Sequence, residues 1–365
     1  MRLYELQDAG GIDSLKLLER PTPRPGPGEV LLRLTAVTLN YRDLLTIKGG
    51  YGTRQKLPLI PLSDAAGVVE AVGPGATRFK TGDRVINAFF PNWLAGEPSE
   101  QKFSGAPGGQ VDGVLSEYRV FPQHALFDAP AHLSDPAAAA LGCAGLTAWS
   151  AVVKFGGLNP GDTVLTQGTG GVSLFALQFA KLAGARVIAT SANNHKIEKL
   201  RKLGADATIN YTTAPNWGSQ VRALTAGRGV DLVVEVGGAG TLNESIRAAR
   251  VGGTIATIGV LADPAGDLRL PLIVMQQLKL QGVTVGSLED FQIMINAIAL
   301  HRQQPVIDRV FPFEQVPEAF AYMAAGKHFG KVAIAFGGSV DAGAIASMSG
   351  ASKHAGEAIV DRLGC

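Results

Sequence analysis

The sequence has little cysteine, little net charge and no long apolar run. Only 2 of its 365 residues are cysteine, which excludes a disulfide framework and fits a reducing cytosol. The net charge is +2 with no run of Lys or Arg, which argues against nucleic acid and anionic membrane surfaces as partners. No apolar segment approaches the ~20 residues that span a bilayer, and the first residues lack the apolar core of a secretory signal. We therefore expect a cytoplasmic protein.

What the sequence does contain is the composition of an ordered globular protein. Hydrophobic residues make up 46% and charged residues 18%, so extensive disorder is not expected. A chain of 365 residues is long enough for two domains, each with its own core.

A strand, a tight turn and a helix are indicated over residues 164–182. An apolar run ends in a glycine cluster, and Leu174 and Leu177 then follow at helical spacing. A helix that begins in such a turn presents free backbone N–H groups and the positive end of its dipole, which suits a pyrophosphate. Gly168 permits the turn, Gly170 lets the phosphates approach the backbone, and Gly171 allows the helix and strand to pack closely. The residues predicted to bind the cofactor here are Gly168, Thr169, Gly170, Gly171 and Val172.

Five further apolar segments predict strands at 185–190, 207–211, 230–236, 253–259 and 278–285, with helical segments between them. This order is typical of a doubly wound parallel sheet, the Rossmann fold. A Rossmann-like domain without nucleotide is the alternative, and the glycine turn at the first strand–helix junction disfavours it. We also assign Val236, Gly237, Ile258 and Gly259, at the ends of two later strands, to the cofactor site.

The flanking segments have a different character. Short strands separated by Pro/Gly turns in residues 1–126 predict a β-rich, partly closed barrel. Segments 306–312 and 330–335, with a helix over 316–325 between them, are expected to return to that barrel. The predicted division is residues 1–126 with 301–337, residues 127–300, and a small-residue-rich tail over 338–365.

With these elements in place, the chain resembles the medium-chain dehydrogenase/reductase superfamily, and within it the zinc-independent quinone-oxidoreductase-like, alcohol-dehydrogenase-like NADP(H) branch. The matching motifs are PGPGEV (25–30), NYRD (40–43), GDRV (82–85), AGLTAW (144–149), PGDTV (160–164), the glycine turn and HFGKV (328–332). The resemblance is specific for the superfamily and unspecific for the substrate. It implies a GroES-like barrel followed by a Rossmann domain, and a homodimer formed through the sixth strands.

The resemblance also locates the zinc ligands of metal-dependent relatives, and most of them are replaced here. Asn40 stands at the first ligand position, Ser63 and Asp64 lie where relatives carry a His-Glu pair, and only Cys143 is retained. One soft ligand with an amide and a hydroxyl does not suit Zn²⁺. We expect no metal site, and we interpret Cys143 as a buried apolar residue rather than a nucleophile.

Without a metal, hydrogen-bond donors must meet the charge that develops on the substrate oxygen. Asn40 is the predicted amide donor at the nicotinamide or the substrate carbonyl, and the alternative is a turn residue that satisfies its own backbone. Tyr51 matches a cleft tyrosine of relatives and is predicted to donate a hydrogen bond or a proton; the alternative is an ordinary loop aromatic. Ser63 and Asp64 are predicted to line the pocket.

Three further residues receive roles from the resemblance or from their neighbours. Thr147, which is expected to face the nicotinamide, and Lys331, which is expected on the floor of the cleft, are both assigned to the cofactor site. Asp43 is interpreted as structural, paired with Arg42 or with a nearby backbone N–H group.

The end of the second predicted strand favours NADP(H). NAD enzymes carry Asp or Glu about 20 residues beyond the first glycine, where it holds the ribose 2′-hydroxyl. Here Thr190 occupies that place, and no carboxylate follows before Glu198. A 2′-phosphate would find donors on Ser191, Asn193 and Lys196, although Lys196 alternatively decorates an exposed helix start. Tyr211 is expected near the adenosine.

The sequence therefore predicts an NADPH-dependent, zinc-independent oxidoreductase that transfers hydride to a quinone, an enone or a related small carbonyl compound. A metal-free alcohol dehydrogenase or ketone reductase is the first alternative. A non-catalytic NADPH-binding sensor or structural protein is the second.

Overall fold

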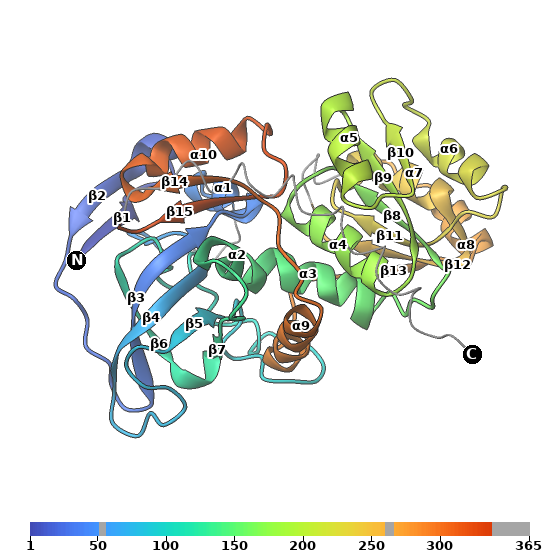
Figure 1. The fold of residues 1–365 in the computed structure, drawn as a ribbon. Coiled ribbons are helices and arrows are strands. Elements are labelled where there is room, and N and C mark those ends of the chain that lie inside the picture. Colours follow the sequence, from blue (N-terminus) through green and yellow to red (C-terminus); the bar gives the residue numbers. More distant parts are fainter. Residues whose placement is uncertain (51–55, 260–265, 338–365) are drawn as a thin grey trace, which may run out of the picture.

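The computed structural model describes residues 1–50, 56–259 and 266–337, and these form two lobes joined by helices. Figure 1 shows the lobe with β3 and β4 beside the lobe with β8 and β11, with α3 and α9 near the junction. No helix in these ranges is long and apolar enough to cross a membrane. The predicted tail over 338–365 lies outside the described residues.

The second lobe is built on a six-stranded, all-parallel sheet in the order β10-β9-β8-β11-β12-β13. Its strands are β8 (Thr163–Gln167), β9 (Arg186–Ser191), β10 (Ala207–Asn210), β11 (Val230–Glu235), β12 (Ala249–Thr257) and β13 (Lys279–Gly282). The helices on it are α4 (Gly171–Leu182), α5 (Asn194–Lys202), α6 (Trp217–Leu224), α7 (Ala239–Ala248) and α8 (Leu270–Met275). This order confirms the predicted Rossmann fold.

One predicted strand is shorter than expected. The apolar run 278–285 forms a strand only to Gly282, because Val285 adopts φ 51°, in the left-handed region, and cannot continue an extended strand. Val283 and Val285, past Gly282, are instead buried in the apolar core that runs between the lobes.

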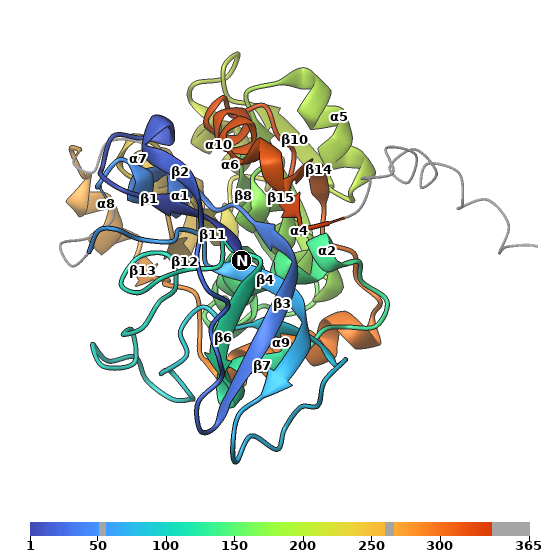
Figure 2. The same cartoon turned by 90° about the vertical axis from the view of Figure 1, so that its left-hand side faces the viewer.

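The first lobe is a mostly antiparallel β structure of the GroES-like type, as predicted. Its seven-stranded sheet runs β14-β15-β3-β4-β5-β7, with β6 also paired to β3. The strands of this sheet are β3 (Glu29–Thr38), β4 (Asp64–Val72), β5 (Arg84–Asn87), β6 (Tyr118–Pro122), β7 (Leu126–Asp128), β14 (Ile307–Pro312) and β15 (Lys331–Ala335). A separate two-stranded sheet pairs β1 (Arg2–Leu6) with β2 (Leu15–Glu19). Figure 2 shows β3, β4 and β6 across the front of this lobe, with α10 (Val316–Ala324) above them.

The last strand of the chain completes the first lobe. β15 pairs antiparallel with β3, so that Ala333 lies opposite Thr38. This pairing brings residues about 300 positions apart into one sheet and places Lys331 beside the start of α1 (Tyr41–Ile47).

Helical segments join the lobes. α2 (Asp135–Ala139), a π-helical turn over Leu141–Gly145, α3 (Leu146–Trp149) and a second π-helical turn over Ser150–Lys154 follow one another without a break. α9 (Leu288–Leu300) packs Phe291 against Phe127 with ring centroids 4.9 Å apart, and Leu288 N donates to Trp93 O. One apolar core runs through both lobes at this junction. The domain boundaries at 126/127 and 300/301 therefore stay a prediction.

Candidate active site

A cleft of about 1100 Å³ lies between the lobes. The second lobe contributes the glycine turn and the ends of its strands, and the first lobe contributes the start of α1 and the segment that leads into β15. The lobes touch at the base of the cleft, where Gly330 N donates to Thr169 O at 2.9 Å.

The glycine turn forms a cradle at one wall of the cleft. Gly168 has φ 71°, and its N–H donates to Thr190 O, so the turn is tied to the neighbouring strand. Gly170 precedes α4, and no side chain in the described part of the chain caps that helix. A Cβ added to Gly170 would meet nothing within 4 Å. The free N–H groups of α4 therefore face open space, as a diphosphate requires.

A buried carboxylate beneath this turn was not anticipated from the sequence. Glu235, fully buried at the end of β11, accepts hydrogen bonds from Gly237 N (2.7 Å), Thr241 Oγ1 (2.6 Å) and Gln167 Nε2 (2.8 Å). It thereby holds the ends of β8 and β11 together. A carboxylate directly after three apolar residues, at the end of the strand, was the available signal.

The other predicted cofactor residues on this lobe divide into two groups. Val236, Ile258 and Gly259 line the cleft, and a Cβ on Gly259 would come within 1.8 Å of Val236 O. Gly237 is not among the lining residues, because its N–H points to Glu235. Its predicted contact with a cofactor is therefore not supported by its position.

At the adenosine end, the structure shifts one predicted contact by one residue. Thr190 is 2% exposed and is absent from the cleft lining, whereas Ser191 lines the cleft. Successive residues of a strand point to opposite faces, so the prediction for Thr190 was wrong by one position. Asn193 and Tyr211 also line the cleft. The Asn193 amide oxygen accepts from His195 N and Lys196 N and so caps α5.

Lys196 lines the cleft, but its ammonium already has partners. Lys196 Nζ donates to Gly326 O and His328 O, each at 2.8 Å, and so ties α5 to the first lobe. Burial, together with the nearby Lys199 ammonium, lowers the pKa of Lys196. The backbone N–H of Lys196 is also taken by Asn193. The Asn193 side chain therefore already satisfies the N–H groups of His195 and Lys196.

The opposite end of the cleft holds a buried polar network around Asn40. The Asn40 amide nitrogen donates to Asp64 Oδ2 at 2.8 Å, and Asn40 Oδ1 accepts from Lys331 Nζ at 2.6 Å. Lys331 Nζ also donates to Leu39 O at 2.6 Å and lies 3.7 Å from Asp64 Oδ2. An anion on one side and a cation on the other fix the orientation of the amide. Asn40 is also the N-cap of α1 and forms a capping box with Asp43, so it takes part in the turn as well as in the network.

Ser63 and Asp64 lie behind this network and not on the cleft wall. Both are fully buried and absent from the lining, and Ser63 Oγ donates to Asp64 Oδ1 at 2.9 Å. The prediction that they line the pocket is therefore wrong: Asn40 and Lys331 stand between them and the cleft. Tyr51 lies outside the described residues.

Asp43 has the structural role expected of it. Its Oδ2 accepts from Asn40 N at 2.7 Å, and its Oδ1 lies 3.5 Å from Arg42 Nη1. Burial raises the pKa of Asp43 to about 6, although the Arg42 charge opposes this. Asp43 therefore fixes the first turn of α1 and with it the position of Asn40.

Cys143 lines the cleft and is half-buried. Burial and the Asp64 carboxylate raise the pKa of its thiol far above the usual value, so it is a protonated, weakly polar wall residue as expected. The described ranges contain no group of three or more His, Cys, Asp or Glu side chains arranged to hold a metal ion.

The remaining wall near Asn40 is apolar. Phe89, Val283 and Val285 line the cleft with Thr147, which is 4% exposed. Val285 is held at φ 51°, a conformation that costs a β-branched residue about 1–3 kcal/mol. Phe89 and Val285 were not anticipated, because no motif distinguishes them from core residues.

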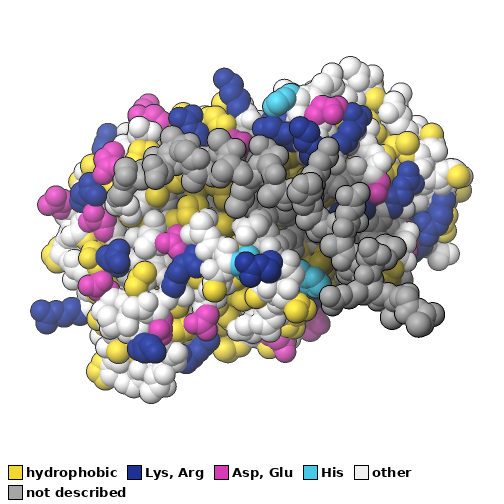
Figure 3. Space-filling view, in the orientation of Figure 1, with side chains coloured by type: hydrophobic (Ala, Val, Ile, Leu, Met, Phe, Trp, Pro, Cys, Tyr) yellow, Lys and Arg dark blue, Asp and Glu magenta, His cyan; other side chains and the backbone are white. Residues whose placement is uncertain are grey.

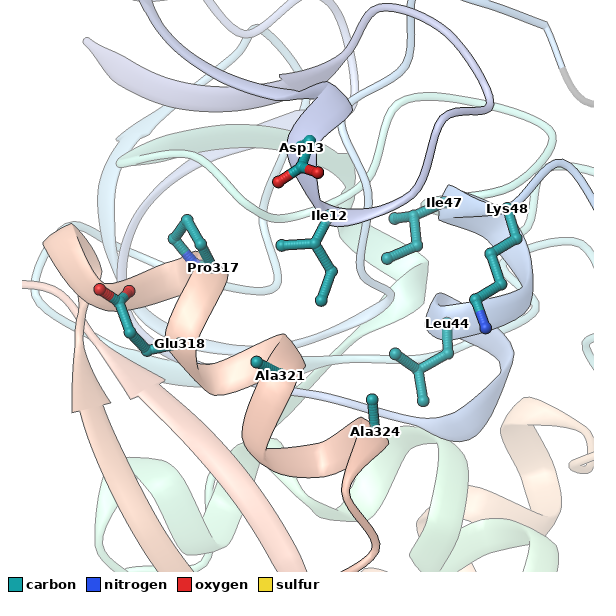
Figure 4. Close-up of a pocket in the computed structure, with 9 residues that line it drawn as sticks. All are labelled: Ile12, Asp13, Leu44, Ile47, Lys48, Pro317, Glu318, Ala321 and Ala324. Carbon is teal, nitrogen blue, oxygen red and sulfur yellow. The ribbon is translucent and has the colours of Figure 1, made fainter.

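A second hollow lies between residues 12–13, α1 and α10 (Figure 4), and it shares Leu44 and Ala324 with the lining of the cleft. Ile12, Leu44, Ile47 and Ala321 face one another across it, and Asp13, Lys48 and Glu318 stand at its edges. It lacks the buried polar groups that the cleft provides around Asn40.

Charged side chains of both signs are spread over the face shown in Figure 3. Basic side chains gather over α5, which carries Lys196, Lys199, Arg201 and Lys202. The positive end of this face therefore lies beside the adenosine end of the cleft.

Comparisons with known proteins agree with this arrangement. Residues 26–131 match the alcohol dehydrogenase GroES-like domain, and residues 171–299 match the zinc-binding dehydrogenase family. A zinc-type alcohol dehydrogenase-like protein of Schizosaccharomyces pombe is 43% identical over 92% of this chain and 99% of its own length. An acryloyl-coenzyme A reductase of Sulfurisphaera tokodaii is 29% identical over 87% of this chain and 96% of its own length.

Solved structures show the same likeness. An NAD-dependent alcohol dehydrogenase superposes with a TM-score of 0.85 at 36% identity, covering 92% of this chain and 100% of its own. A mycobacterial protein in complex with NADPH superposes with a TM-score of 0.77 at 27% identity, covering 92% and 99%.

Proposed function

The chain belongs to the medium-chain dehydrogenase/reductase superfamily, and we propose that within it the protein is a zinc-independent, NADPH-dependent reductase of quinones, enones or related carbonyl compounds. The observation that carries this proposal is the Asn40–Lys331–Asp64 network at the catalytic end of the cleft. The proposal rests on the more general activity of the family, that of an oxidoreductase of the alcohol dehydrogenase type.

Zinc does not fit the residues in that place. Asn40 Oδ1 is bonded to an ammonium group, and the Asp64 carboxylate already accepts from Asn40 and Ser63. A zinc site needs deprotonated sulfur or neutral nitrogen ligands around an open position. We derive no catalytic step through a metal.

A nicotinamide dinucleotide fits the cleft. The uncapped start of α4 and the open space at Gly170 would hold the diphosphate, and Thr147 and Asn40 would face the nicotinamide. When bound, the cofactor supplies a hydride to the electrophilic carbon of the substrate. Asn40 retains one amide hydrogen beyond the one it donates to Asp64, and this hydrogen can orient a carbonyl group. Phe89 and Val283 exclude water from the reacting atoms.

Conjugated substrates suit this site best. Hydride addition to a simple ketone leaves a localised alkoxide, which metal-dependent enzymes stabilise with a Lewis acid. Addition to a quinone or enone spreads the charge, so hydrogen bonds suffice. The likeness to an enzyme named acryloyl-coenzyme A reductase supports an enone, whereas the relatives named alcohol dehydrogenase support a ketone or alcohol substrate, as in the second candidate, a metal-free ketone reductase.

The preference for NADPH rests on the adenosine end of the cleft. Ser191, not a carboxylate, lines the cleft at the end of β9, and α5 brings a basic surface beside it. A 2′-phosphate is therefore met by a hydroxyl and by positive charge. Lys196 could contribute only by exchanging a backbone carbonyl for the phosphate.

We further propose that the protein is a homodimer formed through β13 and α8. β13 is the edge strand of its sheet, and an unpaired strand edge is a template for a second copy. On α8, Val274 and Met275 are 74% and 78% exposed, an unusual exposure for large apolar side chains. The cytoplasmic location stays a prediction.

A steady-state assay of NADPH oxidation tests the main proposal. With 1,4-benzoquinone and 2-cyclohexenone we expect turnover that clearly exceeds turnover with cyclohexanone, and well under one zinc per chain by elemental analysis. Asn40→Ala should lower kcat about 100-fold, whereas Asn296→Ala, on the exposed face of α9, should not. Stoichiometric zinc, or activity confined to alcohols and ketones, would contradict the proposal.

A further inference from the structure

The side chain of Lys331 reaches the catalytic end of the cleft through a space that a glycine without a side chain leaves open. It is the first residue of β15, and its side chain passes over Gly171, where an added Cβ would come within 2.6 Å of Lys331 Cδ. The preceding Gly330 has φ 101° and donates its N–H to Thr169 O. The start of β15 is thus fixed to both lobes, and the lysine stem has one defined route toward Asn40.

The ammonium of Lys331 is buried with fewer partners than it has hydrogens. The residue is 3% exposed, and its Nζ donates to Leu39 O and Asn40 Oδ1. An ammonium group carries three hydrogens, and the nearby Asp64 Oδ2 at 3.7 Å is beyond hydrogen-bond distance. Among the described residues, the third hydrogen has no acceptor in hydrogen-bond range.

This ammonium lies among the residues that resemble a displaced metal site. Asn40 and Asp64 stand at positions that hold zinc in metal-dependent relatives, and Lys331 contacts the first and lies beside the second. Lys331, Asn40 and Cys143 line one end of the cleft whose other wall is the glycine turn. A buried positive charge therefore lies beside two of the positions that hold the Lewis acid in metal-dependent relatives.

We propose that the Lys331 ammonium is the electrophilic catalyst of this enzyme, donating a hydrogen bond to the substrate oxygen on which negative charge develops. This inference rests on the proposed reductase function and names the group that replaces the metal. Asn40, besides orienting the carbonyl group with its second amide hydrogen, positions this ammonium, because its oxygen accepts from Lys331 while Asp64 holds one of its amide hydrogens. The buried, low-dielectric setting strengthens such a hydrogen bond.

The step balances without any further group. When hydride adds to the β-carbon of an enone, the carbon–carbon π pair shifts and the carbonyl oxygen of the substrate becomes an enolate oxygen. The substrate is reduced and the nicotinamide is oxidised. Lys331 keeps its proton and stabilises the enolate by its hydrogen bond, and water then protonates the α-carbon.

The test separates chemistry from cofactor binding. Lys331→Met should lower kcat for 2-cyclohexenone about 100- to 1000-fold, while the Kd for NADPH, measured by fluorescence, should change less than about threefold. Lys80→Met, an exposed lysine of the first lobe, is the matched control and should change neither. In Lys331→Ala, added ethylamine should restore part of kcat, which a merely structural role would not permit.

Each contrary result has one meaning. A tenfold rise in Kd with an unchanged kcat would assign Lys331 to the cofactor and overturn the inference, with the reductase function intact. Wild-type protein that reduces neither quinones nor enones would instead overturn the proposed function. Should Lys331→Met not fold, infrared spectroscopy of wild-type protein with NADP⁺ and carbonyl-labelled 2-cyclohexenone decides the matter. We expect a C=O stretch below its value in water, and an unlowered stretch would refute the hydrogen bond.

Discussion

Gly170→Val tests the phosphate cradle. The protein has room for a side chain at this position, but the side chain would fill the space that we assign to the diphosphate. Gly170 has φ −78° and ψ 177°, an extended conformation that valine adopts readily. Its added Cβ would meet no protein atom within 4 Å. The cost to folding is limited to replacing a favourable residue at the start of α4, about 1 kcal/mol.

The cost to cofactor binding should be much larger. The branched side chain would occupy the open space in front of the uncapped N–H groups of α4, where we place the diphosphate. A charge-assisted hydrogen bond contributes about 1.5–3 kcal/mol, so displacement from two N–H groups should cost at least about 3 kcal/mol. The Kd for NADPH should therefore rise at least about 100-fold.

Fluorescence titration with NADPH, beside far-UV circular dichroism and the melting temperature, measures both effects. Gly282→Val is the matched control, since it also adds a branched side chain where nothing lies within 4 Å but stands outside the cleft lining. Because Gly282 ends β13, at the proposed dimer interface, size-exclusion chromatography of this variant accompanies the titration. NADPH binding that is unchanged in Gly170→Val would show that the cofactor does not use this turn.

Three further outcomes are expected. Ser191→Asp should raise the Kd for NADPH at least about tenfold, because the carboxylate repels the 2′-phosphate. The Kd values for NADPH and NADH should then be about equal. Unchanged titrations would refute the assignment of the end of β9 to the 2′-phosphate. Met275→Lys should convert a dimer to a monomer in size-exclusion chromatography, whereas Leu300→Lys, at the same 78% exposure, should not. Because burial raises the pKa of Asp43 to about 6, its contribution to stability should be complete below about pH 4 and should fall by up to ~3 kcal/mol as the pH rises to about 6. Urea unfolding should show a shallower fall in Asp43→Asn, and identical profiles would contradict the raised pKa.

The sequence was sufficient for the parallel sheet because each strand is an apolar run closed by a turn signal, and both features are local. Val285 shows the limit of that reasoning, since its apolar run looks extended while its backbone is left-handed. Ser191 and Thr190 show a second limit: a motif locates the end of a strand, but which neighbour faces the cleft depends on register.

The hydrogen-bond network around Asn40 could not be predicted from the sequence. Lys331 and Asn40 are 291 residues apart, and their contact exists only because β15 pairs with β3. Motif matching placed both residues at the cleft but not in contact. It also assigned Asp64 to the cleft wall, whereas Asp64 supports Asn40 from behind.

One short segment couples the two ends of the cleft. Residues 326–331 accept the Lys196 ammonium at Gly326 and His328, bond the glycine turn through Gly330, and carry Lys331. A backbone change anywhere in this segment would move the phosphate cradle and the catalytic ammonium together, so it would alter Kd and kcat at once. Side-chain changes at Gly170 and Lys331 leave the segment's backbone contacts in place. A Kd effect from the first and a kcat effect from the second would therefore establish that binding and chemistry are separate tasks on one rigid connection.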